Sequence, residues 1–204
     1  NTLANTNLGW ESTTQLDIGL DAAFLNKRLN LTVDYYRKVT NDILLNLAIP
    51  ATVGLNASPQ NAGAVENKGW EFSASYRGKA NEAGLKYNLG GNLSINRNEV
   101  IDLKGTGPYI VGSDIDPRYI IKKGLPINTL WGYKTDGLFQ SEEEIKAYKA
   151  TYAANTKPGD VKHVDVNGDG KIDANDMTVI GNSFPKFTFG LNSDFSYRNF
   201  ELSL

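Results

Sequence analysis

The chain has 204 residues, 40% of them hydrophobic and 22% charged, with a formal net charge of -2. This composition excludes a largely disordered protein, and the 21 basic residues are spread along the chain, which leaves no basic patch for a nucleic-acid partner. Because cysteine is absent, disulfides, thiolate nucleophiles and cysteine-ligated metal sites are excluded.

The first half of the chain predicts a hairpin followed by a long loop. Residues 13–24 alternate between apolar and polar side chains, and residues 28–38 do so again after a short connection at 25–27. A period of two over this length predicts two antiparallel strands. Residues 41–68 are rich in Asn, Pro, Gly and Ala and show no sustained period, so we expect a long loop there.

Three further alternating segments predict the remaining strands. Residues 70–79 and 85–96 form a second strand pair around a short turn, and residues 187–197 follow a second long connection at 97–185. The alternation resumes before the last residue, Leu204, and the chain begins without methionine. We therefore expect residues 1–204 to be a fragment of a longer barrel protein.

The length of the strands and the alternation of short and long connections predict the fold class. The strands are about ten to thirteen residues long, close to what a tilted strand needs to cross a bilayer, and their connections alternate between short and long. No run approaches the roughly 18 apolar residues of a membrane-spanning helix, but a barrel strand buries only every second side chain in lipid. The pattern predicts an all-β, antiparallel transmembrane-type β-barrel segment with long extracellular loops.

This interpretation assigns the two faces of the sheet to different surroundings. The side chains expected to face lipid are Leu16, Ile18, Leu20, Leu29, Leu31 and Val33. The acidic residues Asp17, Asp21 and Asp34 fall on the opposite face and would point to an aqueous lumen. The alternative is a soluble sandwich whose apolar face packs on a second sheet, and alternation alone does not separate the two.

The second long connection contains a predicted helix. Ser141 followed three residues later by Glu144 is a capping-box pattern, and Ile145, Tyr148 and Tyr152 recur at helical spacing. The sequence therefore predicts a short helix over residues 142–153. Its acidic first turn suits the helix dipole and does not require a metal or sugar ligand.

Residues 165–176 match an EF-hand type calcium loop. Ca²⁺ prefers six to eight oxygen ligands, and this spacing places side-chain and backbone oxygens around one point. The predicted ligands are Asp165, Asn167, Asp169, the Lys171 carbonyl, Asp173 and Asp176. The last position usually carries glutamate, and the shorter aspartate weakens the case for bidentate ligation.

The alternative for this loop is a pair of tight turns held by Asx hydrogen bonds without a metal. Only one such loop is present, so a structural ion that stiffens the connection is expected, and not a calcium switch. The single histidine, His163, lies beside the loop and offers no basis for a catalytic triad. We find no physical case for catalysis and expect no enzyme.

A series of short motifs in order along the whole chain resembles the C-terminal barrel half of SusC/RagA-like TonB-dependent outer-membrane transporters of Bacteroidetes. The matching segments are residues 8–15, 18–21, 33–36, 41–45, 61–63, 66–71, 131–139, 158–160, 165–176 and 179–182. This resemblance implies a 22-stranded barrel with an N-terminal plug, located in the bacterial outer membrane. It also implies import of glycans or peptides, energised by TonB and assisted by a SusD-like surface lipoprotein.

In such a family the connections 41–68 and 97–185 would lie outside the cell, in contact with the lipoprotein and substrate. Because aromatic rings stack on sugars, the candidate substrate contacts are Trp131, Tyr133 and Phe139, and packing inside the connection is the alternative for each. The competing function is a soluble, calcium-stabilised β-sheet binding module of the glycan-binding or adhesin type.

Overall fold

A computed structural model describes residue 5 and residues 7–46, 54, 59–79, 84–105, 107–112, 118–148, 150 and 155–204. The chain divides into two compact units. The first comprises Asn1–Thr106, Lys123–Pro126 and Phe184–Leu204, and the second comprises Gly107–Lys122 and Ile127–Ser183.

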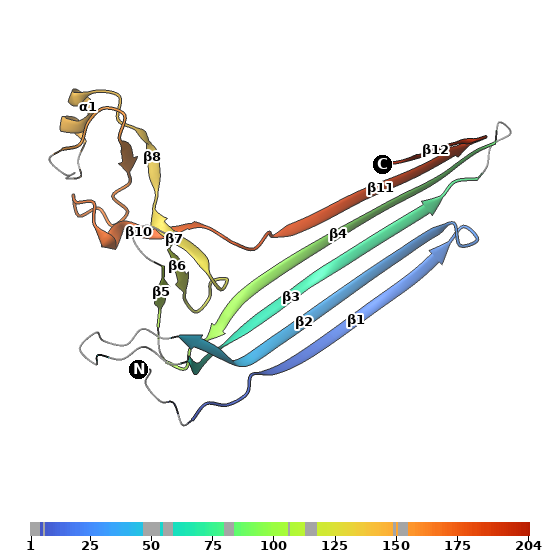
Figure 1. The fold of residues 1–204 in the computed structure, drawn as a ribbon, viewed down its shortest axis with the longest axis horizontal. Coiled ribbons are helices and arrows are strands. Elements are labelled where there is room, and N and C mark those ends of the chain that lie inside the picture. The colour runs from blue at the N-terminus through green and yellow to red at the C-terminus, as the bar shows by residue number, and fades with distance from the viewer. Residues whose placement is uncertain are drawn as a thin grey trace. The chain divides into compact units, whose positions relative to one another are not determined.

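The first unit is a six-stranded antiparallel sheet in the order β1-β2-β3-β4-β11-β12 (Figure 1). Its strands are β1 (Ser12–Phe24), β2 (Leu29–Asn46), β3 (Pro59–Arg77), β4 (Leu85–Asp102), β11 (Phe187–Tyr197) and β12 (Phe200–Ser203). The hairpin between β1 and β2 closes through three residues with positive φ, Leu25, Asn26 and Lys27. All six alternating segments predicted from the sequence are strands of this sheet.

Both long connections begin later than predicted, because the strands continue into them. β2 reaches Asn46 and β3 begins at Pro59, so much of the predicted loop 41–68 is strand. The residues from Ala62 to Glu66 are all buried. A strand covered on both faces shows no polar-apolar alternation, which is why the period-two test missed it.

The long connection predicted at 97–185 contains more secondary structure than the expected helix and turn loop. β4 runs to Asp102, and the second unit contains a small sheet in the order β10-β7-β6-β5 beside a strand pair, β8-β9 (Figure 1). These strands are β5 (Tyr109–Val111), β6 (Tyr119–Ile121), β7 (Thr129–Tyr133), β8 (Thr135–Leu138), β9 (Val161–His163) and β10 (Met177–Gly181). Strands of three to five residues are too short for a periodic signal.

Helix α1 (Glu142–Ala147) begins where the sequence predicted and ends earlier. The Ser141 side chain accepts a hydrogen bond from the Glu144 backbone N–H at 3.2 Å, as expected of an N-cap. Tyr148 leaves the helix in an extended conformation, and its hydroxyl donates to the His163 carbonyl at 2.7 Å. The predicted continuation to residue 153 is therefore wrong at Tyr148; residues 149 and 151–154 lie outside the described part of the chain.

Membrane-spanning helices are absent from the described residues, where no helix combines the necessary length and hydrophobicity.

Candidate functional site

One face of the six-stranded sheet is a continuous apolar surface. The strand register places Leu20, Val33, Phe72, Leu93 and Phe189 in one row across β1, β2, β3, β4 and β11. Leu20 is 67% exposed and Phe189 is 68% exposed, so the face is not sealed by other described residues. An exposed apolar surface of this extent marks an interaction with lipid or with another protein. The six residues predicted to face lipid all lie on this apolar face.

The opposite face is polar and carries charged side chains. The predicted lumen residues Asp21 and Asp34 lie there, and the Thr32 hydroxyl donates to Asp21 at 2.7 Å. The register places Glu71 opposite Asp34, so acidic side chains gather at the middle of this polar face. A shallow hollow of about 350 Å³ lies beside them, lined also by Ser73.

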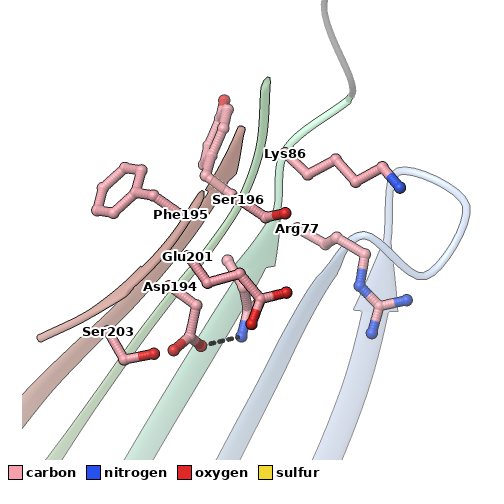
Figure 2. A pocket seen from close by; sticks show the side chains of 9 residues that line it. Arg77, Lys86, Asp194, Phe195, Ser196, Glu201 and Ser203 are labelled. Carbon is pink, nitrogen blue, oxygen red and sulfur yellow. Dashed lines mark hydrogen bonds between the residues drawn. The ribbon is translucent and has the colours of Figure 1, made fainter. Parts of the chain in front are cut away.

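A second hollow, of about 390 Å³, lies near the β11–β12 end of the sheet. Figure 2 shows the side chains of Asp194 and Glu201 pointing away from Phe195 and lying with Arg77 at this hollow. Asn88 donates a long hydrogen bond, 3.5 Å, to the Asp194 carboxylate. Polar and charged groups of both signs therefore line the face that the barrel interpretation assigns to the lumen.

Sequence reasoning missed the cations that end the apolar face. Arg37, Lys68 and Arg97 lie directly opposite one another on β2, β3 and β4. Arg37 and Lys68 both bind the buried carboxylate of Glu66, at 2.6 and 2.5 Å. The available signal was positional, because each cation stands where the apolar alternation of its strand stops.

The predicted calcium loop adopts tight turns closed by its own polar side chains. Asp165 accepts hydrogen bonds from the backbone N–H groups of Gly168 and Gly170, at 2.6 and 2.8 Å. Both glycines have positive φ, which the turns require. Asp169 accepts from the backbone N–H of Lys171 at 2.9 Å. The Asx-turn alternative considered for this sequence is thus present, whether or not an ion binds.

The Asp176 carboxylate holds the two ends of the loop together. It is fully buried and accepts from the backbone N–H groups of Val166 and Asp173, at 2.9 and 2.8 Å. The hydrogen bond from the Asp173 amide is the main reason that the pKa of this carboxyl lies below its usual value, with the Val166 and Asn167 amides adding to the effect. Asp176 occupies the position of the bidentate calcium ligand but uses both oxygens on backbone amides.

The fit of this loop to calcium is mixed. The donor set is all oxygen, as Ca²⁺ prefers, and the turns place the Asp165 and Asp169 carboxylates on one short segment. Within the described ranges, however, no group of three or more acidic, histidine or cysteine side chains converges to hold a metal. The side chains are arranged for hydrogen bonding, and an ion would have to draw them together.

The three predicted substrate-contact aromatics differ in accessibility. Trp131 and Tyr133 are half-buried on β7, and the Tyr133 ring lies 5.1 Å from the His163 ring. Phe139 is 1% exposed and packs edge-on against Tyr148 at 5.6 Å. A ring enclosed in this way cannot stack on a sugar, so Phe139 is corrected to a core residue of the second unit. Trp131 and Tyr133 remain predictions.

Comparison with known proteins identifies the family of this architecture. The sequence model described as "TonB dependent receptor-like, beta-barrel" matches residues 1–200. TonB-dependent receptor P26 of Formosa agariphila is 37% identical over 98% of this chain, and TonB-dependent receptor SusC of Bacteroides thetaiotaomicron is 33% identical over 98%. The chain spans about a fifth of the length of these relatives, 20% and 19%.

Solved structures give the same result for the fold. A chain in the structure of the RagAB peptide transporter superposes with a TM-score of 0.76 at 22% identity, covering 100% of this chain and 21% of that chain. The RagAB peptide importer in its "open-open" state gives 0.74 at 25% identity, covering 99% and 21%. The chain therefore belongs to the TonB-dependent receptor-like β-barrel family, whose members are outer-membrane transport proteins and not enzymes, as the sequence predicted.

Proposed function

We propose that this chain forms part of the wall of a 22-stranded outer-membrane importer, driven by TonB, that takes up glycans or other oligomeric nutrients such as peptides. The observation that carries the proposal is the two-faced sheet, with an exposed apolar face on one side and acidic and amide side chains on the other. A membrane barrel needs this division, because lipid contacts one face and the aqueous lumen the other.

Strand length supports the same function. β1 has 13 residues and β3 has 19, and about 9–11 tilted residues suffice to cross a bilayer. The surplus lies at the end of β2 and β3 that leads into the long connections. In outer-membrane barrels the long connections are extracellular, so the second unit would lie outside the cell.

A SusD-like surface lipoprotein is the proposed partner at that outer end. The similarity to SusC and to the RagAB peptide importer supports this choice and leaves open whether the substrate is a glycan or a peptide. The second unit presents β7, with Trp131 and Tyr133, as its candidate contact with substrate. Transport belongs to the parent protein, of which this chain supplies one section.

The partnership and the substrate class are testable in one strain. We expect the tagged parent receptor, extracted from outer membranes in mild detergent, to co-purify with a lipoprotein encoded beside it. Deletion of the parent gene should abolish growth on one class of oligomer, glycan or peptide, while growth on the monomers continues. Normal growth of the deletion strain on every oligomer tested, with no lipoprotein in the purified material, would contradict the proposal.

We also propose that residues 165–176 bind one Ca²⁺ that braces the second unit. Asp165, Asn167, Asp169, the Lys171 carbonyl and Asp173 would supply oxygens, while Asp176 would hold the loop closed through backbone amides. The oxygen-only donor set and the two glycine turns support the proposal. The ion would contribute stability and no chemistry.

Chelation should loosen this loop. At free calcium about 100 times the Kd, binding stabilises the closed loop by about 2.7 kcal/mol, so EDTA should raise the population of the open loop about 100-fold. Hydrogen exchange or limited proteolysis of the parent receptor, read at residues 165–176, measures the change. Asp169→Asn should reproduce the effect of EDTA without chelator, because it keeps the acceptor for the Lys171 amide and removes the charge.

The matched control is Asp160→Asn, which changes another carboxylate of the second unit that accepts a backbone hydrogen bond, from Lys157 at 2.8 Å. In this variant, residues 165–176 should respond to EDTA as they do in the parent receptor. Equal exchange with and without calcium in the parent would mean that the Asx hydrogen bonds alone close the loop.

A further inference from the structure

The cations that end the apolar face form a single row. Arg37 faces Lys68 across the β2–β3 ladder, and Lys68 faces Arg97 across the β3–β4 ladder. Like charges directly opposite on neighbouring strands destabilise a sheet. Three cations in succession therefore call for anions that neutralise them.

The protein supplies part of that neutralisation. Glu66 is 5% exposed and pairs with Arg37 and Lys68, and Glu99 lies 3.4 Å from Arg97. Three positive charges thus stand against two negative charges, which leaves one positive charge in the row. The Arg97 side chain is 72% exposed, so its guanidinium is open to a further anion.

The position of Arg37, Lys68 and Arg97 in the sheet indicates which anion would neutralise the remaining positive charge. Immediately before this row, on the apolar face, Tyr35 and Trp70 pack with ring centroids 5.0 Å apart. An apolar band, then tyrosine and tryptophan, then arginine and lysine is the order found where a membrane protein passes from hydrocarbon to headgroups. At that depth the available anions are lipid phosphates, whose oxygens suit the guanidinium fork.

We propose that Arg37, Lys68 and Arg97 form a binding site for phosphorylated lipid headgroups at the end of the barrel wall that carries the long connections. The proposal rests on the proposed function, because it requires the apolar face to contact lipid. The buried Glu66 holds two of the cations in place, and the headgroup phosphate neutralises the remaining charge. Bound lipid thereby fixes the depth of the strands in the bilayer.

Trp70 provides the readout, because it lies on the same strand two residues from Lys68. The parent receptor is placed in phosphatidylcholine nanodiscs containing a small fraction of brominated phosphatidylglycerol or, separately, brominated phosphatidylcholine. The fluorescence of Trp70 is obtained as the difference between the parent and a Trp70→Phe variant. Brominated phosphatidylglycerol should quench Trp70 more strongly than the zwitterionic lipid at equal mole fraction.

The double variant Lys68→Gln/Arg97→Gln should remove this preference while leaving the Arg37–Glu66 pair intact. Each cation near a membrane surface strengthens anionic-lipid binding about fivefold, so the loss should be about 25-fold. Lys68→Arg/Arg97→Lys, which conserves charge, should retain the preference.

Lys38→Gln is the matched control, because Lys38 is the exposed neighbour of Arg37 on the polar face. If the double variant does not fold, Arg97→Gln alone should lose about fivefold.

Three outcomes would overturn the inference, and they separate it from the proposed function. Equal quenching by both lipids would reject the headgroup site and leave the membrane wall intact. Loss of the preference on adding millimolar inorganic phosphate would indicate a site for free anions instead of lipid. Absence of quenching by either lipid would reject both the site and the lipid contact of the apolar face.

Discussion

Replacing Leu93 with arginine is expected to prevent stable assembly of the parent barrel. Leu93 lies in the middle of the apolar face, opposite Phe72 on β3 and Phe189 on β11. An arginine at the bilayer midplane on the lipid face costs about 2–4 kcal/mol, a large part of the stability of an ordinary domain. The amount of folded, heat-modifiable receptor in outer-membrane fractions, and its urea midpoint after refolding in detergent, measure the loss.

The adjacent residue provides the control for Leu93→Arg. Asn92 is exposed on the polar face, so Asn92→Arg introduces the same side chain into the same strand without placing it in lipid. Its cost should stay within about 0.5 kcal/mol, as for ordinary surface substitutions. If both variants were equally harmful, or both harmless, the assignment of the two faces to lipid and lumen would be wrong.

The five long strands were predictable because only one face of each is apolar over most of its length. In β1, Leu16 to Phe24 alternate with polar residues, and the hydrophobic pattern sets the register wherever one face is apolar. The failure at residues 62–66 has the complementary cause. There both faces are buried, Ala62, Gly63 and Ala64 carry small side chains or none, and the sequence shows no period.

The second unit was predictable at its turns and not in its packing. The Asp and Gly spacing in residues 165–176 predicted a calcium loop, with Asx turns as the alternative; those turns are present, because a glycine with positive φ and an Asx acceptor are local requirements, and calcium binding stays a prediction. The roles of Asp176 and Phe139 depend on what surrounds them. Backbone amides enclose Asp176, and Tyr148 covers Phe139, and both arrangements follow from contacts that spacing alone does not specify.

The cations at the end of the apolar face show the same limit. Arg37, Lys68 and Arg97 are separated by about thirty residues along the chain, and only the strand register brings them into one row. In the sequence alone, each of the three is an ordinary charged residue at the boundary of a predicted strand. Their grouping is a property of the sheet.

On the polar face, one tyrosine spans three strands across a glycine. Tyr36 on β2 lies over Gly69 on β3, and its hydroxyl donates to the Asn96 side chain on β4 at 3.0 Å. A Cβ atom at position 69 would lie 2.9 Å from the Tyr36 ring and 2.2 Å from the Ile95 carbonyl oxygen. Gly69 therefore provides the space in which the Tyr36 ring crosses β3 and reaches Asn96 on β4.

Gly69→Val should consequently destabilise the barrel by about 3 kcal/mol or more, because overpacking here must displace both a ring and the backbone of β4. Ser73→Val, an exposed position on the same face of β3, is the matched control and should change stability little. Tyr36→Phe isolates the hydrogen bond to Asn96 and should cost about 1 kcal/mol. Urea unfolding of the refolded parent receptor measures all three. If the Gly69→Val barrel were as stable as the parent, the Tyr36 side chain would be able to move away at little cost. The hydrogen bond between Tyr36 and Asn96 would then not be needed to keep the register of β2, β3 and β4.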